Sequence, residues 1–93
     1  MKQQNPIKVT NMDHTSDQDP PYPYTSWLAY WKCHKKERYS PMCSSIECNS
    51  WATDGAHVTS EQLGEKAYIV PLCHECNMRT DEFYVNYHDL LKI

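Results

Sequence analysis

The sequence predicts a small α+β domain whose hydrophobic core needs additional stabilisation. Its 93 residues, of which 40% are hydrophobic, make a single small domain. Domains of about 70 residues or fewer rarely gain more than about 3–5 kcal/mol from the core alone, so they use disulfides, a metal or a partner. Five cysteines are available for this purpose. In chain order, the local patterns predict a tail, a helix, a β-hairpin and a second helix.

Residues 1–24 are expected to form a flexible tail rather than part of the folded domain. The segment is polar, rich in proline and tyrosine, and shows neither the period of a strand nor that of a helix. Its last part, Asp-Pro-Pro-Tyr-Pro-Tyr at 19–24, favours polyproline II and forms either a stiff solvated lead-in or a docking segment. We therefore place the folded domain at residues 25–93.

A helix is predicted to begin after Thr25 or Ser26, either of which can serve as its N-cap, and to end before Pro41. Its apolar stripe consists of Trp27, Leu28, Tyr30, Trp31 and His34. We interpret this stripe as core. The alternative is a nucleic-acid interface in which bases stack on the tryptophans beside Lys32, Lys35 and Lys36.

The rest of the chain predicts a hairpin followed by a helix. Residues 56–59 and 67–72 are rich in strand-forming residues, and the turn region 61–66 lies between them. Residues 77–93 carry apolar side chains at mixed spacing, which we interpret as mainly helical. No stretch approaches the roughly 18 apolar residues that span a bilayer, so no membrane association is expected.

Four cysteines form two pairs with the spacing of zinc ligands. Cys43 and Cys48 enclose a short loop and Cys73 and Cys76 a shorter one, so each pair can turn two sulfurs toward one point. A disulfide framework is disfavoured because the cysteine count is odd and the first residues lack the apolar segment of a secretory signal. We therefore expect a reducing, cytoplasmic location and one structural Zn²⁺ held by these four cysteines.

Other donors leave a variant of this site open. A shell of three cysteines and one histidine is the main alternative, and the spare side chains are Cys33, His34, His57 and His74.

The net charge of the chain limits which partners are expected. The formal net charge of −3 falls to −5 when four thiolates and one Zn²⁺ add −2, which disfavours indiscriminate binding to nucleic acid. A local basic patch remains compatible with this total.

The run Tyr68-Ile69-Val70-Pro71-Leu72-Cys73-His74-Glu75-Cys76-Asn77, with the first cysteine pair and Gly55-Ala56-His57-Val58, resembles the zinc-bearing branch of the HNH, or ββα-metal, nucleases. The resemblance covers roughly residues 41–81. It implies a treble-clef zinc finger, to which the helix after residue 25 would be an N-terminal addition. It also implies a separate catalytic Mg²⁺ or Mn²⁺ in active members, and an origin in phage or mobile elements.

The resemblance also assigns catalytic positions. His57 corresponds to the histidine that activates water as a general base. Ala56 stands where a metal-ligating aspartate or histidine is usual, and Tyr68 where an asparagine orients the histidine. Asn77 matches a polar residue that either ligates the metal or caps the following helix. Asp54 could replace the missing ligand if the turn before His57 folds back.

These differences from the HNH pattern favour a binding role over nuclease activity. A hard cation needs oxygen donors, which Ala56 lacks, and acidic side chains in the predicted last helix would repel phosphate. We therefore expect a non-catalytic HNH-like zinc module that binds a protein or nucleic-acid partner through its tail or either helix. The alternative is a metal-dependent HNH-type endonuclease with His57 as general base, in which Asp54, His74 or Asn77 holds the divalent cation.

Overall fold

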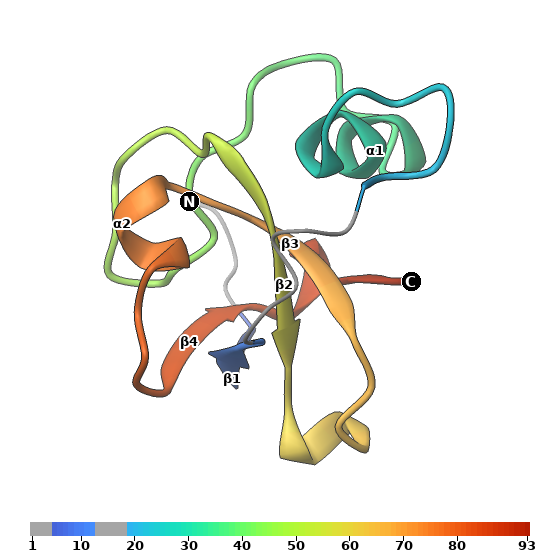
Figure 1. The fold of residues 1–93 in the computed structure, drawn as a ribbon. Helices are drawn as coiled ribbons and strands as arrows, with labels where there is room; N and C mark the ends of the chain where they lie inside the picture. The colour runs from blue at the N-terminus through green and yellow to red at the C-terminus, as the bar shows by residue number, and fades with distance from the viewer. Residues whose placement is uncertain (1–4, 13–18) are drawn as a thin grey trace.

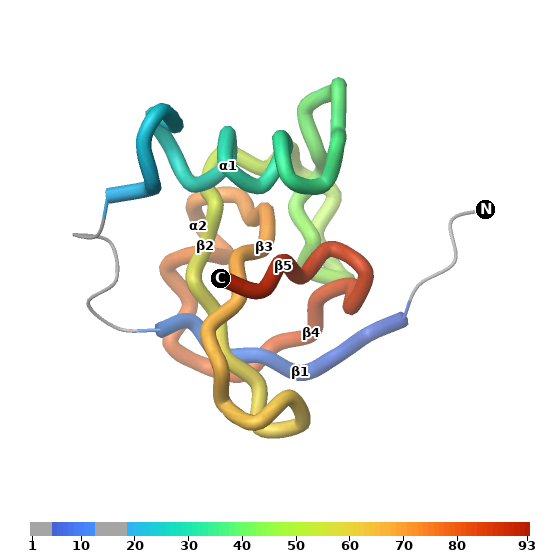
Figure 2. The backbone as a smooth tube through the Cα atoms, turned by 90° about the vertical axis from the view of Figure 1, so that its right-hand side faces the viewer, coloured from blue at the N-terminus to red at the C-terminus, as the bar shows by residue number. Residues whose placement is uncertain are grey.

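A computed structural model describes residues 5–12 and 19–93, which form a curled, five-stranded antiparallel sheet with the strand order β4-β1-β2-β3-β5. Figures 1 and 2 both place helix α1 across the β2–β3 hairpin, with β1 and β4 on the side away from α1. No helix in these two ranges has the length and apolar character needed to cross a membrane. In chain order the elements are β1 (Pro6–Asn11), α1 (Trp27–His34), β2 (Asp54–Thr59), η1 (Glu61–Leu63), β3 (Tyr68–Leu72), α2 (His74–Asn77), β4 (Phe83–Asn86), η2 (Tyr87–Asp89) and β5 (Leu91–Lys92).

The predicted hairpin is present as β2 and β3. The two strands pair antiparallel, with Ala56 opposite Val70 and His57 opposite Ile69. Between them, η1 ends at Gly64, whose φ of 77° lies in the left-handed region that glycine adopts without a steric penalty. The hairpin separates the two cysteine pairs along the chain, so its register fixes where one pair lies relative to the other.

Helix α1 begins where the sequence places an N-cap. The Ser26 hydroxyl accepts a hydrogen bond from the Ala29 amide at 3.0 Å, which satisfies one of the free N–H groups of the first turn. On the inner face Trp31 is only 3% exposed, and its indole N–H donates to the carbonyl of Asp89 at 2.6 Å. The interpretation of Trp31 as a core residue is therefore confirmed, and this ring is not available for stacking on bases.

The prediction of a flexible tail is wrong for residues 6–11, which form β1. This strand lies between β4 and β2, with Val9 opposite Phe83 and Thr10 opposite Thr59. Ile7 and Val9 are buried on one face, so the strand does show period 2. With only two apolar residues, however, the pattern is too short to be recognised in the sequence. Residues 1–4 and 13–18 of the expected tail lie outside the described residues.

Residues 19–24, also within that expected tail, contact α1. The Tyr24 ring packs edge-on against Tyr30, with 5.3 Å between ring centroids, and its hydroxyl donates to the sulfur of Cys33 at 3.2 Å. Tyr22, in contrast, is 96% exposed. Of the two tyrosines in the Pro-Tyr segment, one therefore docks on the domain and the other faces solvent.

The helix predicted over residues 77–93 is not formed. Helix α2 ends at Asn77, and β4, η2 and β5 follow it. Phe83 and Val85 are buried while Tyr84 between them is 49% exposed, so the mixed spacing contains the alternation of a half-buried strand. The only α-helix next to this stretch is thus the single turn of α2, His74–Asn77.

The hydrophobic core connects the sheet to the cysteine loops. Residues from both sets pack into one buried cluster. The sheet contributes Ile7, Val9, Ala56, Val58, Val70, Leu72, Phe83 and Val85, and the cysteine loops contribute Cys43, Cys73 and Cys76. Folding of the sheet and assembly of the cysteine cluster therefore depend on the same buried contacts.

Candidate metal centre

Four cysteine sulfurs converge where the two predicted loops meet. All four Sγ atoms lie within 4.8 Å of one another, and they belong to Cys43, Cys48, Cys73 and Cys76. The sulfurs of Cys48 and Cys73 are 3.8 Å apart. A tetrahedron with Zn–S bonds of about 2.3 Å has edges of about 3.8 Å, which the separation of Cys48 and Cys73 matches, while the remaining sulfur pairs lie within 4.8 Å. One metal ion can be held here.

Backbone hydrogen bonds shape the first cysteine loop. The Cys48 amide donates to the Ser45 carbonyl at 3.0 Å and closes a tight turn. The Cys43 amide donates to the carbonyl of Ser50 at 2.8 Å, which joins the start of the loop to the residues that follow it. These two bonds explain how a four-residue gap can direct both sulfurs to one side.

The second cysteine pair lies at the end of β3. Leu72, which is fully buried, leads directly into Cys73, the N-cap residue of α2, and Cys76 lies within the single turn of that helix. The Asn77 amide donates to the Cys73 carbonyl at 3.0 Å and closes the turn. Two residues of helix between the cysteines place both sulfurs on the same side of α2.

The protein environment makes two of the four thiols harder to deprotonate and one of them easier. Cys43 and Cys76 are buried, and this burial raises the pKa of both thiols. In contrast, hydrogen bonding by the Ser50 backbone lowers the pKa of Cys48 to about 7. A divalent cation among the four sulfurs compensates thiolate charge that burial otherwise disfavours, so metal binding should release protons.

Asn11, at the end of β1, connects this strand to the second cysteine loop. Its side-chain amide donates to the carbonyl of Cys76 at 3.0 Å and to that of Arg79 at 2.9 Å. The sequence gives little sign of this role, because Asn11 falls in a stretch interpreted as a tail. The only signal is its position two residues beyond Val9, on the same face of the strand as the buried side chains.

We expect the Asn11→Ala substitution to lower the free energy of unfolding of the zinc-loaded protein by about 1–2 kcal/mol, because two carbonyls lose their donors. Asn11→Asp should cost more, because the carboxylate places negative charge beside both carbonyl oxygens. Urea unfolding followed by circular dichroism measures both changes. Lys8→Ala, at an exposed position of the same strand, serves as a control and should stay within about 0.5 kcal/mol of the parent.

Two of the predicted catalytic residues lie together beside the cysteine cluster. The Asn77 side chain donates to Oδ2 of Asp54 at 2.9 Å, and Nδ1 of His74 lies 3.3 Å from the same oxygen. Thr53 donates its hydroxyl to the other oxygen of this carboxylate at 3.1 Å. Asp54 therefore joins the start of β2 to α2, and its oxygens already accept hydrogen bonds.

His57 is not in contact with this group. It is 7% exposed, and its ring packs edge-on against Trp27 of α1 with 4.6 Å between centroids. Its Nε2 is buried and has no hydrogen-bond partner among the described residues. Asp54, His57 and Asn77 nevertheless line one surface cavity of about 620 Å³, which Trp27 also borders. Ala56, at the position where the HNH resemblance implies a metal ligand, is a core residue and 2% exposed.

Burial lowers the pKa of His57, which predicts a pH dependence of stability. The unfolded chain binds a proton at this residue below its ordinary pKa of about 6.5, whereas the folded chain binds it only at lower pH. The free energy of unfolding should therefore fall as the pH drops below about 6.5. His57→Phe should show a smaller fall between pH 7.5 and 5.5 in urea titrations, and equal slopes would contradict this prediction.

The spare donors do not join the cysteine group. Among residues 5–12 and 19–93, the four cysteines are the only set of three or more His, Cys, Asp or Glu side chains close enough to hold one ion. Cys33 is exposed on α1, and the Nδ1 of His34 lies 3.0 Å from the carbonyl of Tyr30. The arrangement therefore favours the four-cysteine shell over a shell in which histidine replaces one cysteine.

Comparisons with protein-family models, with curated proteins and with solved structures found no match to this chain.

Proposed function

We propose that this chain is a structural-zinc module of the treble-clef, HNH-like type, and that it binds a macromolecular partner without cutting nucleic acid. The convergence of four cysteine sulfurs within 4.8 Å carries the proposal. Four cysteine ligands that are mostly buried are typical of closed, structural zinc sites, whereas catalytic sites keep a position open for water. The order of loop, hairpin, loop and helical turn also supports the treble-clef assignment.

Metal analysis of the purified protein tests the zinc assignment. We expect one zinc per chain, and we expect Co²⁺ substitution to give the absorption bands of tetrahedral thiolate coordination. Iron in place of zinc, or a folded protein without metal, would overturn the assignment. The Cys33→Ser variant is the matched control, because Cys33 is exposed and lies outside the cluster. It should retain the full metal content.

Exposed aromatic side chains near the first cysteine loop support a binding role. Trp51 is 64% exposed and pairs through a β-bridge with Met42, which is 42% exposed, and Tyr39 is 81% exposed. Large apolar groups of this kind are enriched at protein interfaces. Near the C-terminal end of α1, Lys36 and Arg38 are exposed as well, so this surface also offers charge to a partner.

The second candidate function is a metal-dependent HNH-type endonuclease. The cavity that Asp54, His57 and Asn77 share is the observation in its favour. Three features count against it: Ala56 offers no ligand, Nε2 of His57 is buried, and Asp54 is already bonded to Asn77. Water activation would require His57 to separate from Trp27.

A cleavage assay separates the two functions. The zinc-loaded protein would be incubated with supercoiled plasmid and with single-stranded DNA in Mg²⁺ or Mn²⁺, beside His57→Ala and the exposed-histidine control His88→Ala. We expect no nicking by any of the three proteins. Metal-dependent nicking that His88→Ala retains and His57→Ala loses would overturn the non-catalytic proposal in favour of the endonuclease.

A further inference from the structure

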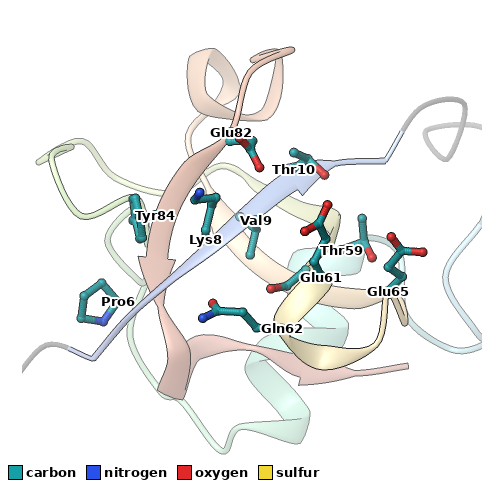
Figure 3. Close-up of a pocket in the computed structure, with 11 residues that line it drawn as sticks. Pro6, Lys8, Val9, Thr10, Thr59, Glu61, Gln62, Glu65, Glu82 and Tyr84 are labelled. Carbon is teal, nitrogen blue, oxygen red and sulfur yellow. The ribbon is translucent and has the colours of Figure 1, made fainter.

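A second cavity lies on the face of β1, away from the cysteine cluster and from the cavity around His57. Its volume is about 370 Å³, and its walls come from β1, from the end of β2 with η1, and from the segment leading into β4. Figure 3 shows Glu61 and Glu65 on one side of β1 and Glu82 on the other. Side chains distant in the sequence thus frame one opening.

The charges around this cavity are not balanced within the protein. Three carboxylates, from Glu61, Glu65 and Glu82, face a single ammonium group, that of Lys8, which leaves a formal charge of −2. None of the four takes part in an ion pair within the described ranges, where the recorded pairs are Arg79 with Asp81 and His74 with Asp54. A cationic ligand would therefore find carboxylates that are not engaged in ion pairs.

Two hydroxyl groups add unused acceptors at the same place. Ser60 lines the cavity and is only 3% exposed, yet its Oγ has no hydrogen-bond partner among the described residues. The same holds for the buried Oγ1 of the adjacent Thr59. Buried hydroxyls without partners are uncommon because they cost free energy. Neither oxygen is accessible in the free protein, so an ammonium or guanidinium group would reach one as a donor only after the wall of the cavity adjusts around it.

The cavity is not suited to a metal ion. The three carboxylates do not come close enough to hold one cation, since the cysteine cluster is the only such group in the described part of the chain. The lining also includes apolar surface from Pro6 and Val9 and the ring of Tyr84, which is 49% exposed. Such a mixture suits a side chain with an aliphatic stem and a charged end.

We infer that this cavity binds a lysine or arginine side chain of a partner protein. The stem packs on Pro6 and Tyr84, while the charged end lies among Glu61, Glu65 and Glu82. The inference deepens the proposed partner-binding function by assigning a cationic protein segment as the partner. It uses neither the zinc ligands nor His57.

The test is an NMR titration of the zinc-loaded full chain, whose dispersed spectrum first confirms folding. The probe is an acetylated, amidated Gly-Lys-Gly-Lys-Gly peptide, with its arginine counterpart and a neutral acetyl-lysine version. We expect the cationic peptides to shift amide signals of residues 8–10, 59–65 and 82–84, and the neutral peptide to leave them unchanged. Loss of zinc or of the fold would count against the proposed function. A folded, zinc-loaded protein without these shifts would overturn this inference alone.

Matched variants separate the site from general electrostatic attraction. Glu61→Gln combined with Glu65→Gln should weaken peptide binding at least about tenfold at roughly 150 mM salt, a loss of about 1.4 kcal/mol. The control pair Glu37→Gln and Glu75→Gln removes the same charge from exposed positions elsewhere and should change affinity less than about twofold. Equal losses in both pairs would overturn the inference.

Two further measurements identify the ligand class. Ser60→Ala should weaken binding of the peptide without lowering the stability of the free protein, because the hydroxyl has no partner there. A stability loss with unchanged affinity would contradict a binding role for Ser60. Spermidine, as a free polyamine, should bind more weakly than the lysine peptide. Tighter spermidine binding would overturn the assignment to a protein partner.

Discussion

Replacing Cys73 by serine is expected to leave the chain unfolded even with zinc in excess. Structural zinc provides about 10–16 kcal/mol of apparent binding free energy in small zinc domains, whereas whole domains are stable by only about 5–15 kcal/mol. Cys73 is 9% exposed and belongs to both the sulfur cluster and the hydrophobic core. Its loss therefore weakens two coupled parts of the structure. Circular dichroism and the dispersion of amide proton signals would report the unfolding.

Chelation provides the matching experiment on the unmodified chain. Removing the metal with EDTA should unfold the parent protein and the Cys33→Ser variant alike, and zinc should restore both. Cys33→Ser itself should lie within about 0.5 kcal/mol of the parent, because its side chain is exposed and outside the sulfur cluster. A metal-free Cys73→Ser protein with a dispersed, native-like spectrum would refute the structural role of zinc.

Gly55→Ala is expected to cost at least about 3 kcal/mol, at the upper end of the range for overpacked sites. A Cβ atom at this position would lie 2.4 Å from the carbonyl carbon of Trp27 and 2.5 Å from the amide nitrogen of Leu28. Both are backbone atoms, so no side-chain rotation relieves the clash and α1 must move away from β2. Urea unfolding measures the cost, and tryptophan fluorescence should report the change around Trp27.

Gly64→Ala is the matched control for this substitution. No atom lies within 4 Å of a Cβ built there, so the cost comes only from the positive φ of 77°. A left-handed residue with a side chain costs roughly 1–2 kcal/mol, and the packing of α1 should not change. If both variants lost the same stability, the close approach of α1 to Gly55 would not be the cause.

The features that the sequence predicts correctly are those specified by short segments. The spacing within each cysteine pair, the strand-forming run that leads into Cys73 and the Ser26 cap all depend on neighbouring residues. The convergence of the two pairs follows once the hairpin between them forms. The zinc ligands could therefore be proposed from the sequence, because each loop already directs its sulfurs toward one point.

The features that the sequence does not reveal depend on contacts between distant segments. Ile7 and Val9 become a central strand only because residues 83–86 pair with them. Conversely, Phe83 and Val85 form a strand instead of a helix because β1 offers an edge. His57 was assigned a catalytic position by resemblance, and its burial against Trp27 depends on α1. The cavity on β1 has the same origin, because its three carboxylates meet only in the folded sheet.

The pairing of β1 with β4 also constrains how the domain forms during synthesis. Pro6 lies opposite Asn86, so one of the first described residues needs a partner that is translated near the end of the described chain. The hairpin and both cysteine loops are complete by Cys76, before residues 83–86 are available to pair with β1. Final closure must wait until Asn86 has left the ribosome, because such long-range pairings form late. Until then β1 has one edge without a neighbouring strand.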